Sequence, residues 1–287
     1  MVESVGVVAV LGLGAMGSAV ASRMVASGVD VVSVFEGRSA ESRERAEAAG
    51  VRAGTWSDLE NADVILSIVP PSEAPAVAAT VADIAASKPG RLFVDCNAVS
   101  PQTMQEIARL FTGTRDRVVD AGIIGGPPKA GARTVIYTSG PDAEALSVLG
   151  DRGLDVRVVD GPIGAASALK MSYAGITKGL TALGAAMMLA ATRADAAADL
   201  AQELRASQPQ LLAWLIRSVP SMLPKAYRFD GEMSEIADFI GEPAAGSDIY
   251  EGMALLYRTI ATDSMRSQNL TAFVETARRL LASEAGR

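Results

Sequence analysis

The chain contains no histidine and only one cysteine among its 287 residues. The lack of histidine excludes a catalytic triad or dyad that uses imidazole, and it excludes any metal site with a histidine ligand. A single cysteine excludes an internal disulfide and a cluster of thiolates. An enzyme built from this sequence must therefore move protons with lysine, tyrosine, aspartate, glutamate or cysteine side chains, and we expect no metal site.

Positive charge is also scarce, because 26 Lys and Arg residues face 33 Asp and Glu residues and give a net charge of −7. Phosphate backbones bind to basic surfaces, so we expect no nucleic-acid partner. The apolar stretch from Val5 to Val20 follows an acidic residue, Glu3, and is interrupted by glycines, unlike a signal peptide. The apolar run Gly179–Ala191 is too short to cross a membrane. These features predict a cytoplasmic protein without membrane association.

In the first half of the chain, short runs rich in valine and isoleucine alternate with segments rich in alanine and glutamate. The expected strands are Val5–Leu11, Val31–Phe35, Val64–Val69, Arg91–Asp95 and Arg117–Asp120, with shorter candidates at Thr134–Thr138 and Val156–Val159. The expected helices are Ala15–Ser27, Ser39–Ala49, Ala74–Ala86 and Thr103–Phe111. Strands that are apolar throughout and alternate with helices indicate a parallel sheet covered on both faces.

Beyond Gly164 the strand-like runs stop, and segments rich in alanine, leucine, methionine and arginine continue to the end of the chain. An alternating β/α region followed by helices alone predicts two domains. We expect an α/β domain with a doubly wound parallel sheet over residues 1–163, and an all-α domain over residues 164–287.

The first expected strand leads into a G-x-G-x-x-G sequence at the start of the first expected helix. Its residues are Gly12, Leu13, Gly14, Ala15, Met16 and Gly17. The first glycine permits a tight turn, the second leaves space for a pyrophosphate, and the third lets the helix pack close to the strand. The N-terminus of the helix offers backbone N–H groups and a positive dipole end to the phosphates. This pattern predicts a Rossmann domain that binds a dinucleotide.

Three residues after the second expected strand bear on the choice between NAD and NADP. Glu36 stands where an acid usually bonds the ribose hydroxyls of NAD. Arg38 and Ser39 follow, and a guanidinium with a hydroxyl suits the 2′-phosphate of NADP. The sequence favours NADP, and NAD stays open.

Four segments in order resemble the β-hydroxyacid dehydrogenases, which are relatives of 6-phosphogluconate dehydrogenase and of the imine reductases. Gly12–Gly17 resembles their G-L-G-x-M-G motif, and Asp95–Pro101 resembles a D-x-S-T-x-x-P stretch. Asp120–Gly126 resembles the D-x-x-x-S-G-G substrate loop, and Gly164–Met171 resembles the helix that carries a catalytic lysine, here Lys170. The C-terminal half resembles a subgroup with a terminal domain of unknown function.

The resemblance implies an NAD(P)-dependent oxidoreductase that interconverts an alcohol and a carbonyl on a small metabolite, which can be acidic. Val69, Pro70 and Asn97 would join the glycine motif in binding the cofactor, and Gly125 and Gly126 would bind the substrate. An NADPH-dependent imine reductase and a non-catalytic nucleotide-binding sensor are the alternatives.

Lys170 is the expected general acid/base, because carbonyl reduction needs a proton on oxygen and histidine is absent. It lies on an apolar segment, where burial disfavours the charged form of an amine. Helical spacing brings Tyr173 to the same face and Lys178 to its border. Either side chain is a candidate to bind substrate in place of the family's asparagine, since Ala174 occupies that position.

Other positions also depart from the family pattern. Ile124 stands where a serine helps to hold a substrate carboxylate, and Asn97 and Ala98 replace a Ser-Thr pair. A simple 3-hydroxy acid is therefore not assumed as the substrate. Imine reductases usually replace the lysine, so Lys170 favours hydroxy and carbonyl compounds, while Tyr173 keeps imine reduction open.

The helical half is expected to form a homodimer and one wall of the substrate cleft, as the resemblance implies. The segment Lys225–Glu235 mixes aromatic and charged residues, and Tyr227, Arg228 and Glu232 are its candidates for contact with substrate. The alanine-rich run Gly179–Ala191 favours close packing between helices at a dimer interface.

Overall fold

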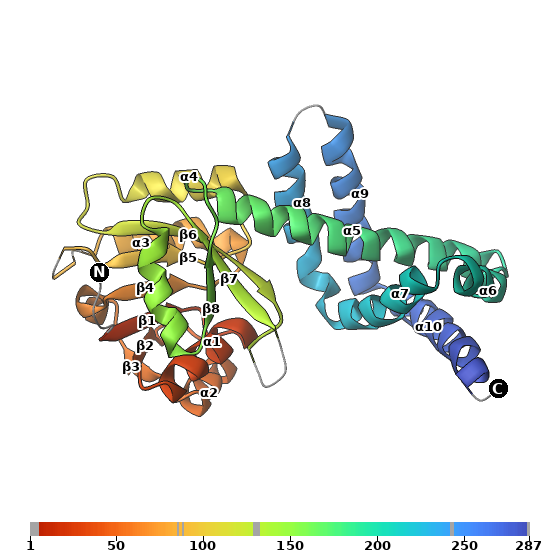
Figure 1. Cartoon of the computed structure of the whole chain (residues 1–287), viewed down its shortest axis with the longest axis horizontal. Coiled ribbons are helices and arrows are strands. Elements are labelled where there is room, and N and C mark those ends of the chain that lie inside the picture. The colour runs from red at the N-terminus through yellow and green to blue at the C-terminus, as the bar shows by residue number, and fades with distance from the viewer. Residues whose placement is uncertain (1–5, 85, 88, 129–132, 242–243, 286–287) are drawn as a thin grey trace. The chain divides into compact units, whose positions relative to one another are not determined.

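The computed structural model describes residues 6–84, 86–87, 89–128, 133–241 and 244–285. Glu3 and Val5, used above, lie outside the described residues, as does Ala85 within the third expected helix. The chain divides into two compact units, the first ending at Met171 and the second beginning at Ser172 (Figure 1). The expected boundary between residues 163 and 164 stays a prediction.

The first unit is built on an eight-stranded sheet in the order β3-β2-β1-β4-β5-β6-β7-β8 (Figure 1). The strands are β1 Val7–Leu11, β2 Asp30–Val34, β3 Arg52–Gly54, β4 Val64–Ser67, β5 Leu92–Asp95, β6 Arg117–Gly125, β7 Thr134–Ser139 and β8 Asp155–Val158. The strand order reverses between the parallel neighbours β1 and β4, and this position is the switch point of a Rossmann sheet. The predicted α/β Rossmann domain followed by a helical region is confirmed.

Two features of the sheet differ from a wholly parallel arrangement of the expected strands. Strand β6 continues past Asp120 to Gly125 and pairs antiparallel with β7. The connection to Thr134 is too short for a crossover helix, and parallel neighbours need roughly a dozen residues or more. Strand β3 was not expected, because Arg52–Gly54 is short, partly exposed and without an apolar run.

Alternate residues of the strands belong to two hydrophobic cores, one on each face of the sheet. Val8 and Val10 of β1 pack with residues of α1, α2 and the 3₁₀ helix η3, whereas Ala9 and Leu11 pack with residues of α3 and α4. The helical elements are α1 Ala15–Ala26, α2 Ala40–Ala48, η1 Ser57–Asn61, η2 Pro71–Glu73, α3 Ala74–Ala82, α4 Pro101–Leu110 and η3 Ala143–Arg152. Strands buried on both faces explain why the apolar runs are continuous.

The second unit consists of helices. They are the C-terminal part of α5 Ala165–Arg193, then α6 Ala197–Ser207, α7 Pro209–Met222, η4 Leu223–Lys225, α8 Ala226–Ile240, α9 Ala244–Thr262 and α10 Ser264–Ala285. Helices α8 and α9 lie side by side (Figure 1), and α10 contacts α6 and α7. The expected apolar run Gly179–Ala191 is thus part of a longer helix. By length and composition α5 is the one helix among the described residues that could cross a membrane, and 44% of its most apolar window is buried. A single helix of this kind is weak evidence for a membrane span, because core helices of soluble proteins have the same length and composition.

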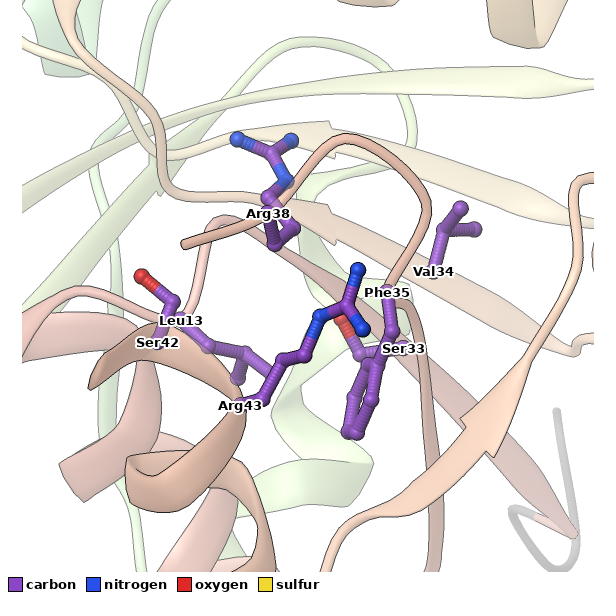
Figure 2. Close-up of a pocket in the computed structure, with 7 residues that line it drawn as sticks. All are labelled: Leu13, Ser33, Val34, Phe35, Arg38, Ser42 and Arg43. Atoms are coloured by element: carbon purple, nitrogen blue, oxygen red, sulfur yellow. The ribbon is translucent and has the colours of Figure 1, made fainter. Parts of the chain in front are cut away.

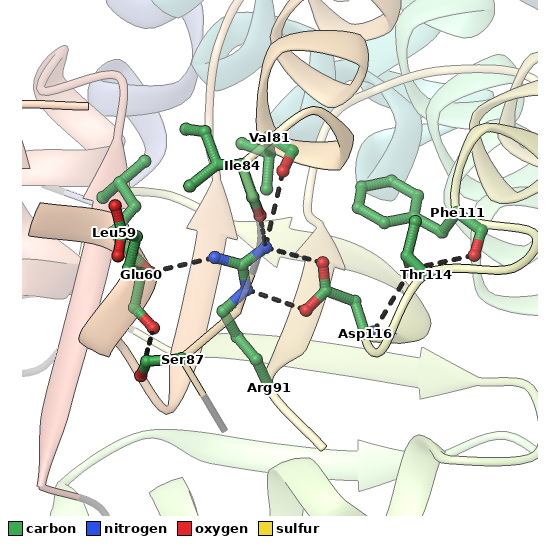
Figure 3. Close-up of polar contacts among 9 residues, drawn as sticks. All are labelled: Leu59, Glu60, Val81, Ile84, Ser87, Arg91, Phe111, Thr114 and Asp116. Atoms are coloured by element: carbon green, nitrogen blue, oxygen red, sulfur yellow. Dashed lines mark hydrogen bonds and ion pairs between the residues drawn. The ribbon is translucent and has the colours of Figure 1, made fainter. Parts of the chain in front are cut away.

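Arg91 and Asp116 form a buried ion pair at the amino end of the sheet, with side-chain exposures of 0% and 2% (Figure 3). Arg91 Nε and Nη2 donate to the two carboxylate oxygens at 2.8 and 2.6 Å. The remaining donors bond the carbonyls of Leu59 at 3.0 Å and Ile84 at 2.7 Å. Both charges are therefore compensated, and this pair joins the starts of β5 and β6 to η1 and to the segment after α3.

Candidate active site

The carboxyl edge of the parallel strands collects the motifs that the sequence singled out. Leu11, Ser67, Asp95 and Asp120 stand level across β1, β4, β5 and β6. The glycine turn follows Leu11, Val69 and Pro70 follow Ser67, and the motif segments Asp95–Pro101 and Asp120–Gly126 begin at the other two residues. Parallel sheets bind their ligands outside this edge, so the edge positions the candidate site.

The three glycines of the turn have different structural roles. Gly12 has a φ of 93°, and a Cβ on it would lie 2.8 Å from Val69 Cγ1. A Cβ on Gly17 would collide with the Gly12 carbonyl oxygen. At Gly14 no atom of the described residues lies within 4 Å of the Cβ position, and φ is −69°. The fold itself requires the first and third glycines, whereas Gly14 faces open space.

Gly14 is the N-cap of α1, and no described side chain caps that helix end. The first N–H groups of a helix have no partner within the helix, and they carry the positive end of its dipole. An anion in front of Gly14 would satisfy them. The residues present therefore fit the pyrophosphate of a dinucleotide.

A shallow hollow lies at the end of β2, with about 180 Å³ of empty space that is partly open to solvent (Figure 2). It is lined by Leu13, Ser33, Val34, Phe35, Arg38, Ser42 and Arg43. Two of these residues, Arg38 and Arg43, carry guanidinium groups, which suit an anionic ligand (Figure 2). Arg43 and Ser42 were missed by the sequence reasoning, although they occupy the first turn of a helix that directly follows β2.

The other residues considered for the cofactor choice lie around this hollow. Arg38 Nη1 lies 3.8 Å from the Glu73 carboxylate. Ser39 caps α2 by accepting a hydrogen bond from the Ser42 N–H at 3.3 Å. Glu36 is exposed and does not belong to the described lining of the hollow. Arginine side chains, rather than an acid, therefore form the charged part of its wall.

Asn97 is the centre of a buried polar network between β4 and β5. Its Oδ1 accepts the Val69 N–H at 2.7 Å, and its Nδ2 donates to Ser67 Oγ at 3.0 Å and to Asp95 Oδ2 at 2.8 Å. The amide is thus engaged on both sides, and it holds the backbone at Val69 just before the exposed Pro70. The expected link of these three residues to the cofactor stays a prediction.

Burial raises the pKa of Asp95 to about 7, against two hydrogen bonds from Asn97 that lower it. The pKa of the neighbouring Cys96 thiol is also raised by burial. A buried thiol with a raised pKa is a poor nucleophile and a poor proton carrier. The single cysteine therefore serves the core.

Asp120, buried at 0% exposure, anchors the start of α5. Its Oδ2 accepts the N–H groups of Gly164, Ala166 and Ser167 at 2.9 to 3.1 Å and the Ser139 hydroxyl at 2.8 Å. Its Oδ1 accepts the Ser167 hydroxyl at 2.6 Å. A carboxylate that satisfies the first N–H groups of a helix also interacts favourably with the helix dipole. Asp120 therefore ties α5 to β6.

Lys170 lies on α5 where that helix crosses β6. Its Nζ donates to the Ile123 carbonyl oxygen at 2.5 Å, and the side chain is half-buried. Helix and strand come close because β6 has a glycine there: a Cβ on Gly122 would lie 3.0 Å from Lys170 Cβ. The amine is thus held at the carboxyl edge of the sheet, three residues beyond the level of Asp120.

Of the expected substrate residues, Gly125 ends β6 and Gly126 follows it. Gly125 has a φ of 123°, and a Cβ on it would lie 3.0 Å from Thr134 Cα, so β7 requires glycine there. At Gly126 no described atom lies within 4 Å of the Cβ position. Ile124, half-buried, lies between Ile123 and these glycines. Gly126 thus resembles Gly14, since no described residue fills the space beside it.

The remaining candidates belong to the second unit. Tyr173 is 50% exposed, and Tyr227 and Arg228 are exposed. Lys178 forms an ion pair with Glu232, and its amine lies 4.3 Å above the centre of the Phe229 ring. The Lys178–Glu232 pair is thus part of the packing between α5 and α8.

The arrangement in the first unit is that of a dinucleotide-binding Rossmann protein, with its glycine turn at the switch point of the sheet. Residues 7–151 match the family model for the NAD binding domain of 6-phosphogluconate dehydrogenase, and the chain belongs to this family. Residues 191–260 match a domain of unknown function, DUF1932. The resemblance drawn from the sequence motifs is confirmed, and the family is one of NAD(P)-binding oxidoreductases.

Individual relatives include enzymes and proteins of unknown function. An NAD-dependent L-serine dehydrogenase of Pseudomonas aeruginosa is 30% identical over 147 residues, which are 48% of this chain and 47% of that enzyme. A solved structure of a conserved protein of unknown function, described as similar to 3-hydroxyacid dehydrogenases, is 30% identical with a TM-score of 0.67, covering 88% of this chain and 99% of that one.

More distant structures share the fold. The 3-hydroxyisobutyrate dehydrogenase of Mycobacterium tuberculosis, solved with L-serine, has a TM-score of 0.73 at 20% identity and covers 96% of this chain and 100% of that one. A reductive aminase of Aspergillus terreus has a TM-score of 0.59 at 18% identity and covers 94% and 100%. The same fold is thus found in dehydrogenases and in reductive aminases.

Proposed function

We propose that the chain is an NAD(P)-dependent oxidoreductase that interconverts an alcohol and a carbonyl on a small metabolite, with Lys170 as general acid/base. The observation that carries this proposal is the Lys170 amine, held by the Ile123 carbonyl at the sheet edge where the glycine turn opens. Membership of an oxidoreductase family supports the reaction class.

The bound nicotinamide would supply hydride to the substrate carbon or accept it. The N–H groups at the start of α1 would hold the pyrophosphate, and Asn97 holds the neighbouring backbone at Val69. In reduction, Lys170 Nζ gives a proton to the substrate oxygen, and in oxidation it takes that proton back. Its hydrogen bond to the Ile123 carbonyl keeps the amine in the same orientation in its protonated and in its neutral form.

The acid/base role is tested by replacing Lys170 with methionine, which removes the amine and keeps much of the side-chain volume. We expect turnover to fall by roughly 10²- to 10⁴-fold and the Kd for NADPH to stay unchanged. Lys225→Met is the matched control, because Lys225 is exposed on the second unit. Retained turnover in Lys170→Met would contradict the mechanism. Cofactor binding without turnover of any alcohol, carbonyl or imine by the unaltered chain would favour the sensor instead.

We propose NADP as the preferred cofactor, since Arg38 and Arg43 line the hollow at the end of β2. Replacing both with methionine should raise the Kd for NADPH by about 10- to 100-fold, as for two lost charge-assisted hydrogen bonds, and leave the Kd for NADH within about threefold. Glu36→Gln is the corresponding variant that tests for NAD. A selective loss of NADH affinity in that variant would show that the acid holds the ribose hydroxyls and that NAD is used.

Imine reduction is the second candidate, favoured by the reductive aminase with the same fold and by the exposed Tyr173. Activity on cyclic imines that is lost in Tyr173→Phe and retained in Lys170→Met would support it. The opposite pattern, with carbonyl reduction dependent on Lys170, supports the main proposal.

We propose a homodimer in which α5 of a second copy covers α5. Exposed apolar side chains recur on this helix at alternating spacings of four and three, the pattern that packs against another helix. They are Tyr173, Ile176, Leu180, Leu183 and Met187. The charged residue within this span, Lys178, is engaged with Glu232. Sedimentation should therefore give a dimer that Ile176→Asp with Leu183→Asp converts to monomers, and an unaltered monomer would contradict this interface. A cytoplasmic location also stays a prediction.

A further inference from the structure

Arg45 lies on α2, yet its guanidinium reaches the glycine turn. Its Nε donates to the Leu13 carbonyl oxygen at 3.2 Å, and its Nη2 donates to Ser42 Oγ at 3.0 Å. Its Nη1 lies 3.9 Å from the Glu41 carboxylate. One side chain thus joins the residue between the first two glycines of the motif to the first turn of α2.

The bond to Leu13 restrains the peptide that carries the Gly14 N–H. In a planar trans peptide the carbonyl and the following N–H point in opposite directions, so fixing the Leu13 oxygen fixes the direction of the Gly14 N–H. Gly14 has no side chain to restrain it, and no described atom lies within 4 Å of its Cβ position. Glycine also loses more conformational freedom on ordering than other residues do. The Ser18 N–H and hydroxyl hold the Gly14 carbonyl at 3.0 and 2.7 Å, and Arg45 adds a restraint on the preceding peptide, which carries the Gly14 N–H.

The second bond reaches the wall of the neighbouring hollow. Ser42 lines that hollow with Arg38 and Arg43, whereas Arg45 is not among the described lining residues. Leu13 also lines it, from the side of the glycine turn. Arg45 is thus hydrogen-bonded to two wall residues that come from different elements, the β1–α1 turn and α2.

We propose that Arg45 is a positioning residue for the dinucleotide, which holds the pyrophosphate-binding turn at a fixed distance from the hollow for the adenosine ribose. This inference rests on the proposed binding of NAD(P)H. A dinucleotide spans both places, so a fixed spacing reduces the ordering that binding requires. Because Arg45 acts on the spacing and not on the 2′-phosphate, it serves NADPH and NADH alike.

The test compares Arg45→Met with Arg43→Met in the full chain, by titration with NADPH, NADH and adenosine 2′-monophosphate. Arg45→Met should raise the Kd for NADPH and for NADH by the same factor, about 10- to 100-fold for the loss of a charge-assisted hydrogen bond and of preorganisation. Its Kd for adenosine 2′-monophosphate, which occupies the hollow alone, should stay within about threefold. Arg43→Met should weaken NADPH and adenosine 2′-monophosphate and spare NADH.

Arg45→Lys separates position from charge, because lysine keeps the charge but cannot make both hydrogen bonds. It should bind both dinucleotides as weakly as Arg45→Met, and it stands in for that variant if methionine prevents folding. The inference is overturned if either variant binds NADPH and NADH like the unaltered chain. It is also overturned if NADPH and adenosine 2′-monophosphate weaken while NADH does not, since Arg45 would then be a direct phosphate ligand. An unaltered chain that binds neither dinucleotide would instead refute the proposed function.

Discussion

Replacing Asp120 with asparagine tests how the first unit secures the helix that carries Lys170. Asparagine has the same shape, so its oxygen can still face the N–H groups of Gly164, Ala166 and Ser167, and its NH₂ group can donate to the Ser167 hydroxyl. The change therefore removes the charge and leaves most of the contacts. Hydrogen bonds to a charged group contribute about 1.5–3 kcal/mol each and neutral ones about half as much.

Three backbone donors share the Asp120 charge, and the charge also faces the positive end of the α5 dipole, which adds about 0.3–2 kcal/mol. The energies of hydrogen bonds that share one acceptor do not simply add, so we expect Asp120→Asn to lower the free energy of unfolding of the first unit by about 2–3 kcal/mol. Asp120→Ala should cost more, because it leaves buried N–H groups without an acceptor.

The assay is urea unfolding followed by tryptophan fluorescence in a Trp214→Phe background. The remaining Trp56 precedes η1 and reports on the first unit alone. Ser167→Ala is the matched control, since it removes one hydroxyl donor and should cost about 1 kcal/mol. A loss of less than about 0.5 kcal/mol in Asp120→Asn would refute the reasoning, because the carboxylate charge would then contribute nothing to holding α5.

Three further changes separate structure from function in the first unit. Arg91→Met should lower the free energy of unfolding by about 3–5 kcal/mol because Asp116 is left buried and unpaired, and adding Asp116→Asn should restore part of it in the same urea assay. Asp95 has a pKa of about 7 in the folded chain and about 3.9 in an unfolded one, so the folded chain keeps a proton that the unfolded chain releases. The contribution of this group to the free energy of unfolding is therefore complete below about pH 4 and is lost as the pH rises to about 7. Between pH 4 and pH 8 the free energy of unfolding of Asp95→Asn should therefore rise by roughly 2–4 kcal/mol relative to that of the unaltered chain. A difference between the two chains that does not change with pH would contradict this. Gly14→Ala should change the free energy of unfolding by less than about 1 kcal/mol and raise the Kd for NADPH at least tenfold, whereas Gly12→Ala should unfold the turn. A Gly14→Ala variant that binds NADPH normally would contradict the role given to the open space at Gly14.

The sequence predicts those helices and strands of the first unit whose residues follow a local pattern. Strands such as Val64–Ser67 are buried on both faces, so apolar runs mark them directly, and a serine such as Ser39 caps the helix that it precedes. Strand β3, Arg52–Gly54, escapes prediction because it lies at the edge of the sheet, where polar and small residues suffice. The antiparallel turn from β6 into β7 escapes prediction because pairing direction depends on the length of the connection, which an apolar pattern does not encode.

The candidate site is predictable in part for a similar reason. The glycine motif and Lys170 are local signals, since spacing within one turn or one helix carries the information. Arg43 and Arg45 gain their meaning from a hollow and a turn that lie on another element. Asp120 likewise acts on residues more than forty positions away in the chain. Long-range contacts of this kind follow from the sheet order, so a single sequence without the fold does not reveal them.

The missing histidine leaves four candidates for proton transfer at the carboxyl edge, and their contacts distinguish them. The oxygens of Asp120 accept five hydrogen bonds from the start of α5 and from Ser139, so this carboxylate is committed to structure. Asp95 titrates near neutral pH but is enclosed by Asn97, and Cys96 is buried with a raised pKa. Lys170 differs because it is a half-exposed amine at this edge, and one of its contacts is a hydrogen bond donated to the Ile123 carbonyl oxygen. Lys170 is therefore the residue that we propose for proton transfer, since the fold holds it at this edge and leaves it half-exposed.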